Sequence, residues 1–196
     1  PRPMSKIVRA ALIGLVVAFV VGFGFGWIDS LSGEASSMPY LAGAFAGVFT
    51  TYILGNLAGN KKVDTINGAE KERALAFAPS DGKALIIVYR TGFIGSAAGL
   101  NVRLDGKEVA QLKSPRFTII PTDPGPRVLS AGFGGLAGPQ NKDAETPLVI
   151  EAGQVLCFKP KSSMGALRNT VTLEEQPVAD DLRRTLRGMT MVRAEI

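Results

Sequence analysis

The sequence predicts a membrane-spanning α-helical hairpin followed by an all-β antiparallel sandwich and a C-terminal helix. Two long apolar runs without charge lie in the first 59 residues, and no such run recurs beyond residue 60. Short strand-like runs alternate with glycine- and proline-rich turns over residues 82–176. We therefore expect a membrane part at 1–59, a linker at 60–81, a β-domain at 82–176 and a C-terminal segment at 177–196.

The two apolar runs have the length and composition of transmembrane helices, predicted at residues 7–28 and 38–59. Residues 10–28 and 38–59 contain no charged side chain, and about 18 uncharged apolar residues are enough to cross a bilayer. A cleaved signal peptide is the alternative for the first run. Its apolar stretch is longer than such signals usually have, and it ends in a poor cleavage site, so a retained hairpin is favoured.

Small residues recur every four positions in both runs. They are Ala10, Gly14, Ala18, Gly22 and Gly26 in the first run, and Gly43, Gly47, Thr51, Gly55 and Gly59 in the second. Residues four apart share one face of a helix, and small residues let helix backbones approach closely in lipid. These faces are predicted helix-packing surfaces, which turn either toward each other or toward another subunit.

The stretch GFGFGW at residues 22–27 has the glycine content of a phosphate-binding loop. Such a loop follows a strand and opens a water-exposed helix N-terminus. This stretch lies inside an apolar run and ends in a tryptophan, so a packing surface is the better interpretation. On a helix, Gly22 and Gly26 lie on the packing face and Gly24 lies off it.

The charges that flank the two runs predict an orientation. Basic residues precede the first run and follow the second, whereas the connecting loop, residues 29–37, carries acidic residues and no basic one. The positive-inside rule then places both termini and the β-domain on the cytoplasmic side of the membrane, which we expect to be the inner membrane of a bacterium. The predicted membrane-interface anchors are Trp27, Tyr40, Arg9, Lys61 and Lys62.

Beyond the polar linker, which has room for one or two helical turns, the pattern becomes that of short strands. They are predicted at residues 83–90, 102–104, 107–112, 116–121, 127–131, 147–150, 154–159 and 169–174. Asp105-Gly106 between two of them is typical of a two-residue type I′ hairpin turn. Seven or eight short strands with frequent turns predict an antiparallel sandwich of immunoglobulin-like or prealbumin-like type.

Two stretches of this region resemble a known family. Residues 84–131 combine a strand ending in Tyr89-Arg90, the run VRLDGKEVAQL, an aromatic strand and a Pro-Gly turn, and residues 148–159 read LVIEAGQVLCFK. This combination resembles the DUF2846 family of bacterial β-domains over about residues 82–176. The resemblance implies a β-domain without an assigned activity. Many family members look like exported lipoproteins, whereas this chain has two apolar runs and no lipid-attachment cysteine.

The C-terminal segment, residues 177–193, is predicted to form an amphipathic helix that Gly188 could cut short. Its apolar face suits either docking to a partner subunit or anionic membrane, or packing on the chain's own sandwich. The apolar glycine-rich loop at residues 131–138 is typical of an interface. The predicted partner-docking residues are Phe133, Leu136, Leu182, Leu186 and Met189.

The sequence offers little catalytic chemistry. Without histidine, it lacks the commonest general base and metal ligand, and its single cysteine, Cys157, lies in a predicted core strand. The loop at residues 92–99 is rich in glycine but is not followed by the Lys-Ser/Thr of a phosphate-binding motif. The net charge of +5 is scattered, which argues against nucleic-acid binding. We expect no enzyme, no metal and no cofactor.

These observations favour a non-catalytic accessory subunit that packs into a larger bacterial membrane complex, for example a photosynthetic or respiratory one. Its expected partners are other membrane subunits and the lipid bilayer. The alternative is a stand-alone, membrane-anchored β-sandwich that binds a small ligand, lipid or peptide.

Overall fold

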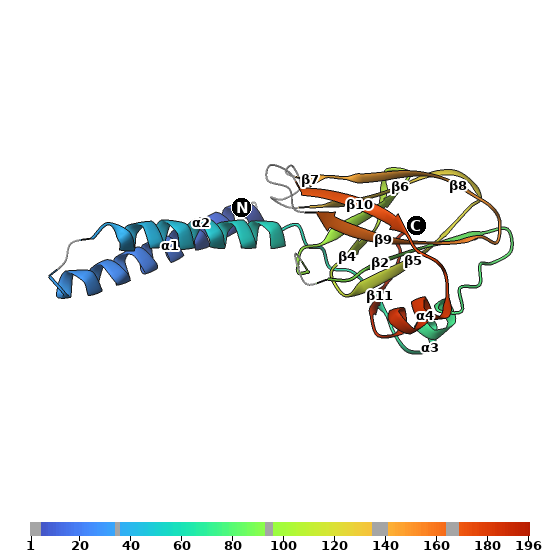
Figure 1. Cartoon of the computed structure of the whole chain (residues 1–196), viewed down its shortest axis with the longest axis horizontal. Coiled ribbons are helices and arrows are strands. Elements are labelled where there is room, and N and C mark those ends of the chain that lie inside the picture. The colour runs from blue at the N-terminus through green and yellow to red at the C-terminus, as the bar shows by residue number, and fades with distance from the viewer. Residues whose placement is uncertain (1–4, 34–35, 93–95, 135–140, 164–168) are drawn as a thin grey trace. The chain divides into compact units, whose positions relative to one another are not determined.

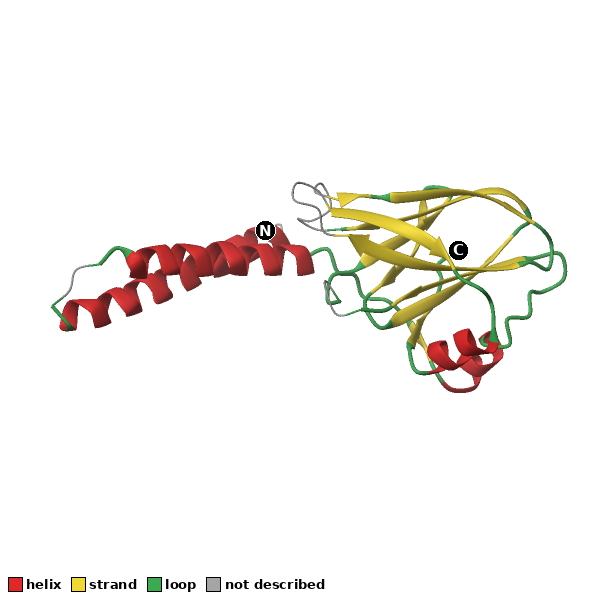
Figure 2. Ribbon diagram, viewed as in Figure 1, coloured by secondary structure: helices red, strands yellow, loops and turns green. Residues whose placement is uncertain are grey.

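The computed structural model describes residues 5–33, 36–92, 96–134, 141–163 and 169–196 (Figure 1). By its internal contacts the chain divides into two compact units, Pro1–Gly59 and Asn60–Ile196. The first unit is helical, and the second is built mainly of strands with two short helices (Figure 2). Each unit is described separately.

The first unit is a hairpin of two helices, α1 (Lys6–Leu31) and α2 (Met38–Leu57). The hydroxyl of Ser5 accepts a hydrogen bond from the Val8 N–H at the start of α1, 3.2 Å away, and Pro39 occupies the first turn of α2, where a missing N–H costs nothing. With 26 and 20 residues, both helices are long and apolar enough to cross a membrane.

The second unit contains two β-sheets that face each other. The larger sheet has the order β1-β11-β5-β2-β9-β10-β7, and the smaller has the order β4-β3-β6-β8. The strands are β1 (Thr65–Ile66), β2 (Ala84–Arg90), β3 (Leu100–Leu104), β4 (Lys107–Leu112), β5 (Arg116–Thr122), β6 (Gly125–Phe133), β7 (Asn141–Lys142), β8 (Ala144–Ile150), β9 (Val155–Ser163), β10 (Asn169–Glu175) and β11 (Thr190–Val192). The predicted sheet-rich domain is thus present.

Local turn chemistry accounts for the hairpins of this domain. Asp105 and Gly106 both have positive φ, 52° and 79°, as a type I′ turn between β3 and β4 requires. The purely antiparallel prediction is correct for the smaller sheet and wrong for the larger one. There β2 pairs in parallel with β9, β5 with β11, and β7 with β10. Each of these pairs joins strands that are distant in sequence or separated by a crossover. No local turn motif predicts such a pairing.

The central strand β2 is buried on both faces. Ala84, Ile86 and Val88 point into the core between the two sheets, whereas the alternate residues Leu85 and Ile87 contribute to a second apolar cluster. This second cluster also contains side chains of α4 (Asp180–Arg187) and of the segment that includes α3 (Gly68–Ala74). The two short helices therefore cover the outer face of the larger sheet, side by side in Figure 1.

The C-terminal helix exists but is shorter than residues 177–193. It ends at Arg187 with Gly188 as its C-cap, and the chain then forms β11. This strand pairs in parallel with β5 and antiparallel with β1. The region predicted as a linker also contributes to the fold, since β1 and α3 both lie within it. The sequence predicts that Gly188 could end this helix, but it does not predict the three-residue strand that follows.

Candidate functional site

The two rows of small residues meet along one seam between α1 and α2. A Cβ atom added at Gly43 would lie 2.5 Å from the carbonyl oxygen of Ala18 and 2.6 Å from the nitrogen of Gly22. A Cβ atom at Gly47 would lie 2.6 Å from the carbonyl oxygen of Gly14. Most of these obstacles are backbone atoms, which cannot move aside independently. Only glycine permits this approach at positions 43 and 47.

The remaining small residues take different places along the seam. Thr51 donates its hydroxyl hydrogen to the carbonyl oxygen of Gly47 at 2.9 Å, and a Cβ atom at Gly14 would collide with the Thr51 hydroxyl. Gly26 faces the Tyr40 ring, and a Cβ atom at Gly26 would lie 3.6 Å from the Tyr40 hydroxyl oxygen. Gly55 and Ala10 are also buried. Gly59 lies beyond the end of α2, and a Cβ atom at Gly24 would meet nothing within 4 Å.

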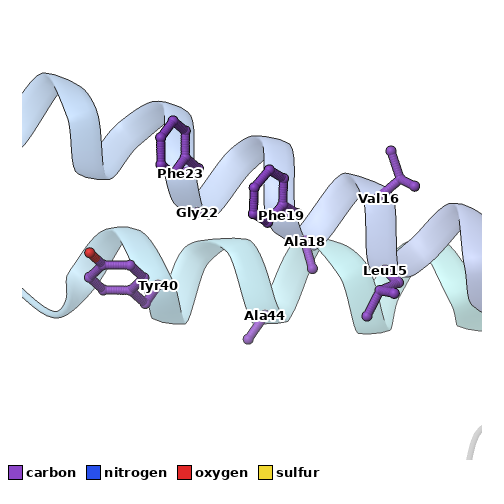
Figure 3. Close-up of a pocket in the computed structure, with 8 residues that line it drawn as sticks. All are labelled: Leu15, Val16, Ala18, Phe19, Gly22, Phe23, Tyr40 and Ala44. Atoms are coloured by element: carbon purple, nitrogen blue, oxygen red, sulfur yellow. The ribbon is translucent and has the colours of Figure 1, made fainter.

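An apolar groove runs beside this seam on the surface of the hairpin. Its lining includes Phe19 and Phe23 of α1 together with Tyr40 and Ala44 of α2 (Figure 3). The groove has a volume of about 630 Å³, and small residues of the seam form part of its lining. This volume is large enough for the side chains of another apolar segment or for part of a lipid chain.

Aromatic side chains cover much of the outer surface of both helices. The rings of Phe19 and Phe23 stack with their centroids 5.6 Å apart, and Phe23 is followed by Trp27 at 6.3 Å. On α2, Phe45 and Phe49 stack at 6.0 Å. All five are exposed. Since the small residues are used between the two helices, the surface offered to any partner is aromatic and aliphatic.

The predicted anchor residues lie at the surface of their respective units. Trp27 and Tyr40 are 60% and 65% exposed, and Arg9 and Lys62 are exposed as well. Lys61 forms an ion pair with Glu108, with 2.7 Å between Nζ and Oε1. Interfacial anchoring by these residues stays a prediction.

Three of the predicted docking residues are buried in the chain's own core. Leu182, Leu186 and Met189 pack into the cluster on the outer face of the larger sheet, together with Phe117. Their assignment to a partner interface is wrong, because the apolar face of α4 is satisfied within the domain. Phe133 is half-buried, and the guanidinium carbon Cζ of Arg90 lies over its ring, 4.9 Å from the ring centroid. Leu136 lies outside the described residues.

The thiol of Cys157 is unsuited to nucleophilic chemistry. Its side chain is 0% exposed, and burial raises its pKa to about 12, so the thiol stays protonated at neutral pH. Within the described ranges, no group of three or more acidic, cysteine or histidine side chains is arranged to hold a metal ion.

Sequence reasoning missed a buried polar network at the end of β2. Arg90 is 4% exposed and donates from Nη1 to the carbonyl oxygens of Ala98, at 2.5 Å, and Leu112, at 3.0 Å. Burial lowers the pKa of Arg90 to about 10. A charged residue at the end of a strand is usually exposed to solvent, so the sequence does not predict a buried arginine here. The only indication is that Arg90 directly follows Tyr89 at the end of an apolar run.

A second part of this network holds the first residues of the second unit, which begins at Asn60. Asn60 donates its amide hydrogen to the carbonyl oxygen of Ala97 at 2.9 Å and accepts from the N–H of Gly99 at 2.7 Å. The N–H of Lys61 donates to the side-chain oxygen of Gln111 at 2.7 Å. Asn60 and Lys61 are thus fixed to the residues just before β3 and to β4.

Comparison with known proteins adds no family to this picture: no family model matches the chain, and no curated protein shows significant similarity to it. The resemblance to the DUF2846 β-domains stays a prediction from the sequence.

Proposed function

We propose that this chain is a non-catalytic accessory subunit that packs into a larger bacterial membrane complex and stabilises it. In this proposal α1 and α2 cross the inner membrane, and the β-domain lies on the cytoplasmic side. The host would be a respiratory, photosynthetic or comparable assembly.

The observation that carries the proposal is the surface of the helical hairpin. The glycines Gly14, Gly43 and Gly47 pack between α1 and α2. The two helices therefore pack against each other without another subunit. What remains outside is an apolar groove flanked by stacked aromatic rings. In lipid, association between helices depends on shape and close van der Waals contact. A groove of this kind supplies such a shape to a neighbouring transmembrane helix.

The chemistry of the chain supports a role without catalysis. The cysteine is buried and protonated, and the composition contains no histidine. The alternative function, a membrane-anchored binding module that acts alone, is favoured by one observation: a polar pocket of about 410 Å³ in the β-domain. The following experiment separates the two.

The test is extraction of the chain from its native membrane in a mild detergent, followed by native-gel sizing and mass spectrometry of the proteins that migrate with it. An accessory subunit should migrate with a defined set of larger membrane proteins. Migration at the size of the 20.6 kDa chain plus detergent would overturn the proposal and favour the stand-alone binding module.

A pair of variants links the result to the groove. Ala44 lines the groove and Ala42 does not, although both are exposed residues of α2. Residues two apart point to different faces of a helix. Ala44→Phe should fill the groove and release the chain from its partners, whereas Ala42→Phe should leave them bound. Equal co-migration of both variants would show that partners bind elsewhere.

A further inference from the structure

A polar pocket of about 410 Å³ lies at one end of the β-domain. Three segments distant in sequence form it: the residues before β3, the turn between β4 and β5, and the turn between α4 and β11. Ser96, Ser114 and Thr190 each bring a hydroxyl group to its lining. The backbone N–H of Ser114 donates to the carbonyl oxygen of Ser96 at 3.0 Å, which joins the first two segments.

The charge of this pocket is positive. Lys113 and Arg116 belong to its lining, and none of the lining residues is acidic. Among the described residues, neither cation forms an ion pair, whereas Lys61, Lys83 and Arg127 of the same domain each do. Two cations and several hydroxyl groups without a carboxylate are the donor set that proteins use to bind phosphate.

A third cation, Arg90, holds two of the segments that line the pocket. Arg90 binds the carbonyl oxygens of Ala98 and Leu112, which are the chain neighbours of the lining residues Ala97 and Lys113. Its burial and its two hydrogen bonds fix both segments. The lining is therefore held in place before any ligand arrives, which lowers the entropy cost of binding.

The register of the larger sheet brings two lining residues of the pocket together. Arg116 of β5 is the direct cross-strand partner of Thr190 of β11, and directly opposite residues share one face of a sheet. Both residues belong to the lining of the pocket, so a cationic residue and a hydroxyl residue lie side by side there.

We propose that this pocket binds a phosphate group, held by Lys113 and Arg116 and by the hydroxyls of Ser96, Ser114 and Thr190. The phosphate could belong to a lipid headgroup or to a free phosphate compound. A lipid headgroup is considered because Asn60, which donates a hydrogen bond to the Ala97 carbonyl oxygen in the pocket lining, is only three positions after the last residue of the predicted membrane helix α2. The experiment therefore tests both sources of phosphate.

The experiment uses the full chain in detergent micelles, with Lys113→Gln, the double variant Lys113→Gln/Arg116→Gln, and Lys142→Gln as the control. Lys142 is an exposed lysine of β7 outside the pocket. Inorganic phosphate is titrated calorimetrically against chloride at equal ionic strength. In a second arm, native mass spectrometry compares retention of phosphatidylglycerol with that of phosphatidylcholine.

Removal of one charged donor should weaken phosphate binding about tenfold or more, and removal of both should abolish it. Saturable binding of inorganic phosphate that only the pocket variants lose would support a free phosphate ligand. Retention of phosphatidylglycerol alone, again lost only in the pocket variants, would support a lipid headgroup. If neither probe binds, or if the pocket variants bind like Lys142→Gln, the proposal is overturned.

The folding of the variants is checked by their thermal melting, and the single variant Lys113→Gln keeps the test valid if the double variant unfolds. The pocket lies wholly within the second unit, Asn60–Ile196. If the phosphate proposal fails, the accessory-subunit proposal is unaffected. Conversely, a chain that migrates alone in the native gel would overturn the accessory-subunit proposal and leave the phosphate proposal unaffected.

Discussion

The closest approach of the two helices can be tested with a single methyl group. In Gly43→Ala, the new Cβ atom would lie 2.5 Å from the Ala18 carbonyl oxygen, whereas ordinary contacts begin at 3.4 Å. The helices would have to separate locally by about 0.9 Å to restore such a contact. Overpacking of a closely fitted interface costs about 1–3 kcal/mol.

A matched control removes the effect of helix propensity. Gly24→Ala makes the same chemical change in α1 at a site where the Cβ atom meets nothing within 4 Å. Alanine favours a helix over glycine by about 1 kcal/mol at either position, so the difference between the two variants isolates the steric term. We expect Gly43→Ala to be less stable than Gly24→Ala by about 1–3 kcal/mol.

The fluorescence of Trp27 supplies the assay. It is the single tryptophan of the chain and lies on α1, so its emission during unfolding in sodium dodecyl sulfate reports on the hairpin. Each variant is reconstituted in mild detergent and titrated with the denaturing detergent. Equal midpoints for Gly43→Ala and Gly24→Ala would refute the close contact of the two backbones.

Three other predictions follow from the structure. Leu186→Ala should destabilise the β-domain by about 2–5 kcal/mol in a thermal melt, because it removes a side chain that is 0% exposed; a change below about 0.5 kcal/mol would contradict the core position of α4. Because burial raises the pKa of Cys157 from 9.0 to about 12, the unfolded chain loses this proton first. The free energy of unfolding should then fall as the pH rises above 9, by up to about 1.4 kcal/mol per pH unit, and Cys157→Ala should flatten that slope. The same buried thiol permits a topology test, in which Ser32→Cys in intact cells should react with a membrane-impermeant maleimide, whereas Asp81→Cys should react only after permeabilisation; the reverse pattern would refute the cytoplasmic placement of the β-domain.

The parts of the fold that depend on neighbouring residues can be predicted from the sequence. The strand at residues 84–90 and the Asp105-Gly106 turn are examples, because β-branched runs and positive-φ turn residues act locally. The pairing of β2 with β9 could not be predicted, because parallel neighbours are chosen by packing between distant segments. The strand β11 escapes prediction for the same reason: its three residues are stabilised by β5 and β1.

The candidate interface shows the same division. A four-residue spacing identifies the small faces of both helices, and the structure brings Gly22 and Gly43 together along them. The spacing alone does not say which surface a face meets, since the pattern is identical for a neighbour in the same chain and in another. For Leu182 and Leu186 the predicted docking role is wrong, because both side chains are buried in the chain's own core. The sequence could not show this, since an amphipathic helix of eight residues has the same pattern whether it covers its own sheet or a partner.

The position of the seam changes how partner binding must be tested. A bulky substitution such as Gly47→Leu would collide with Gly14 and Ala18 within the same chain. It would separate α1 from α2 whether or not a partner exists, so a loss of assembly in that variant would say nothing about the outer surface. The groove residue Ala44 is exposed, and a larger side chain there leaves the seam unaltered. In the proposed function a partner helix meets the groove and its flanking aromatic residues, so changes at those residues are the ones that test partner binding.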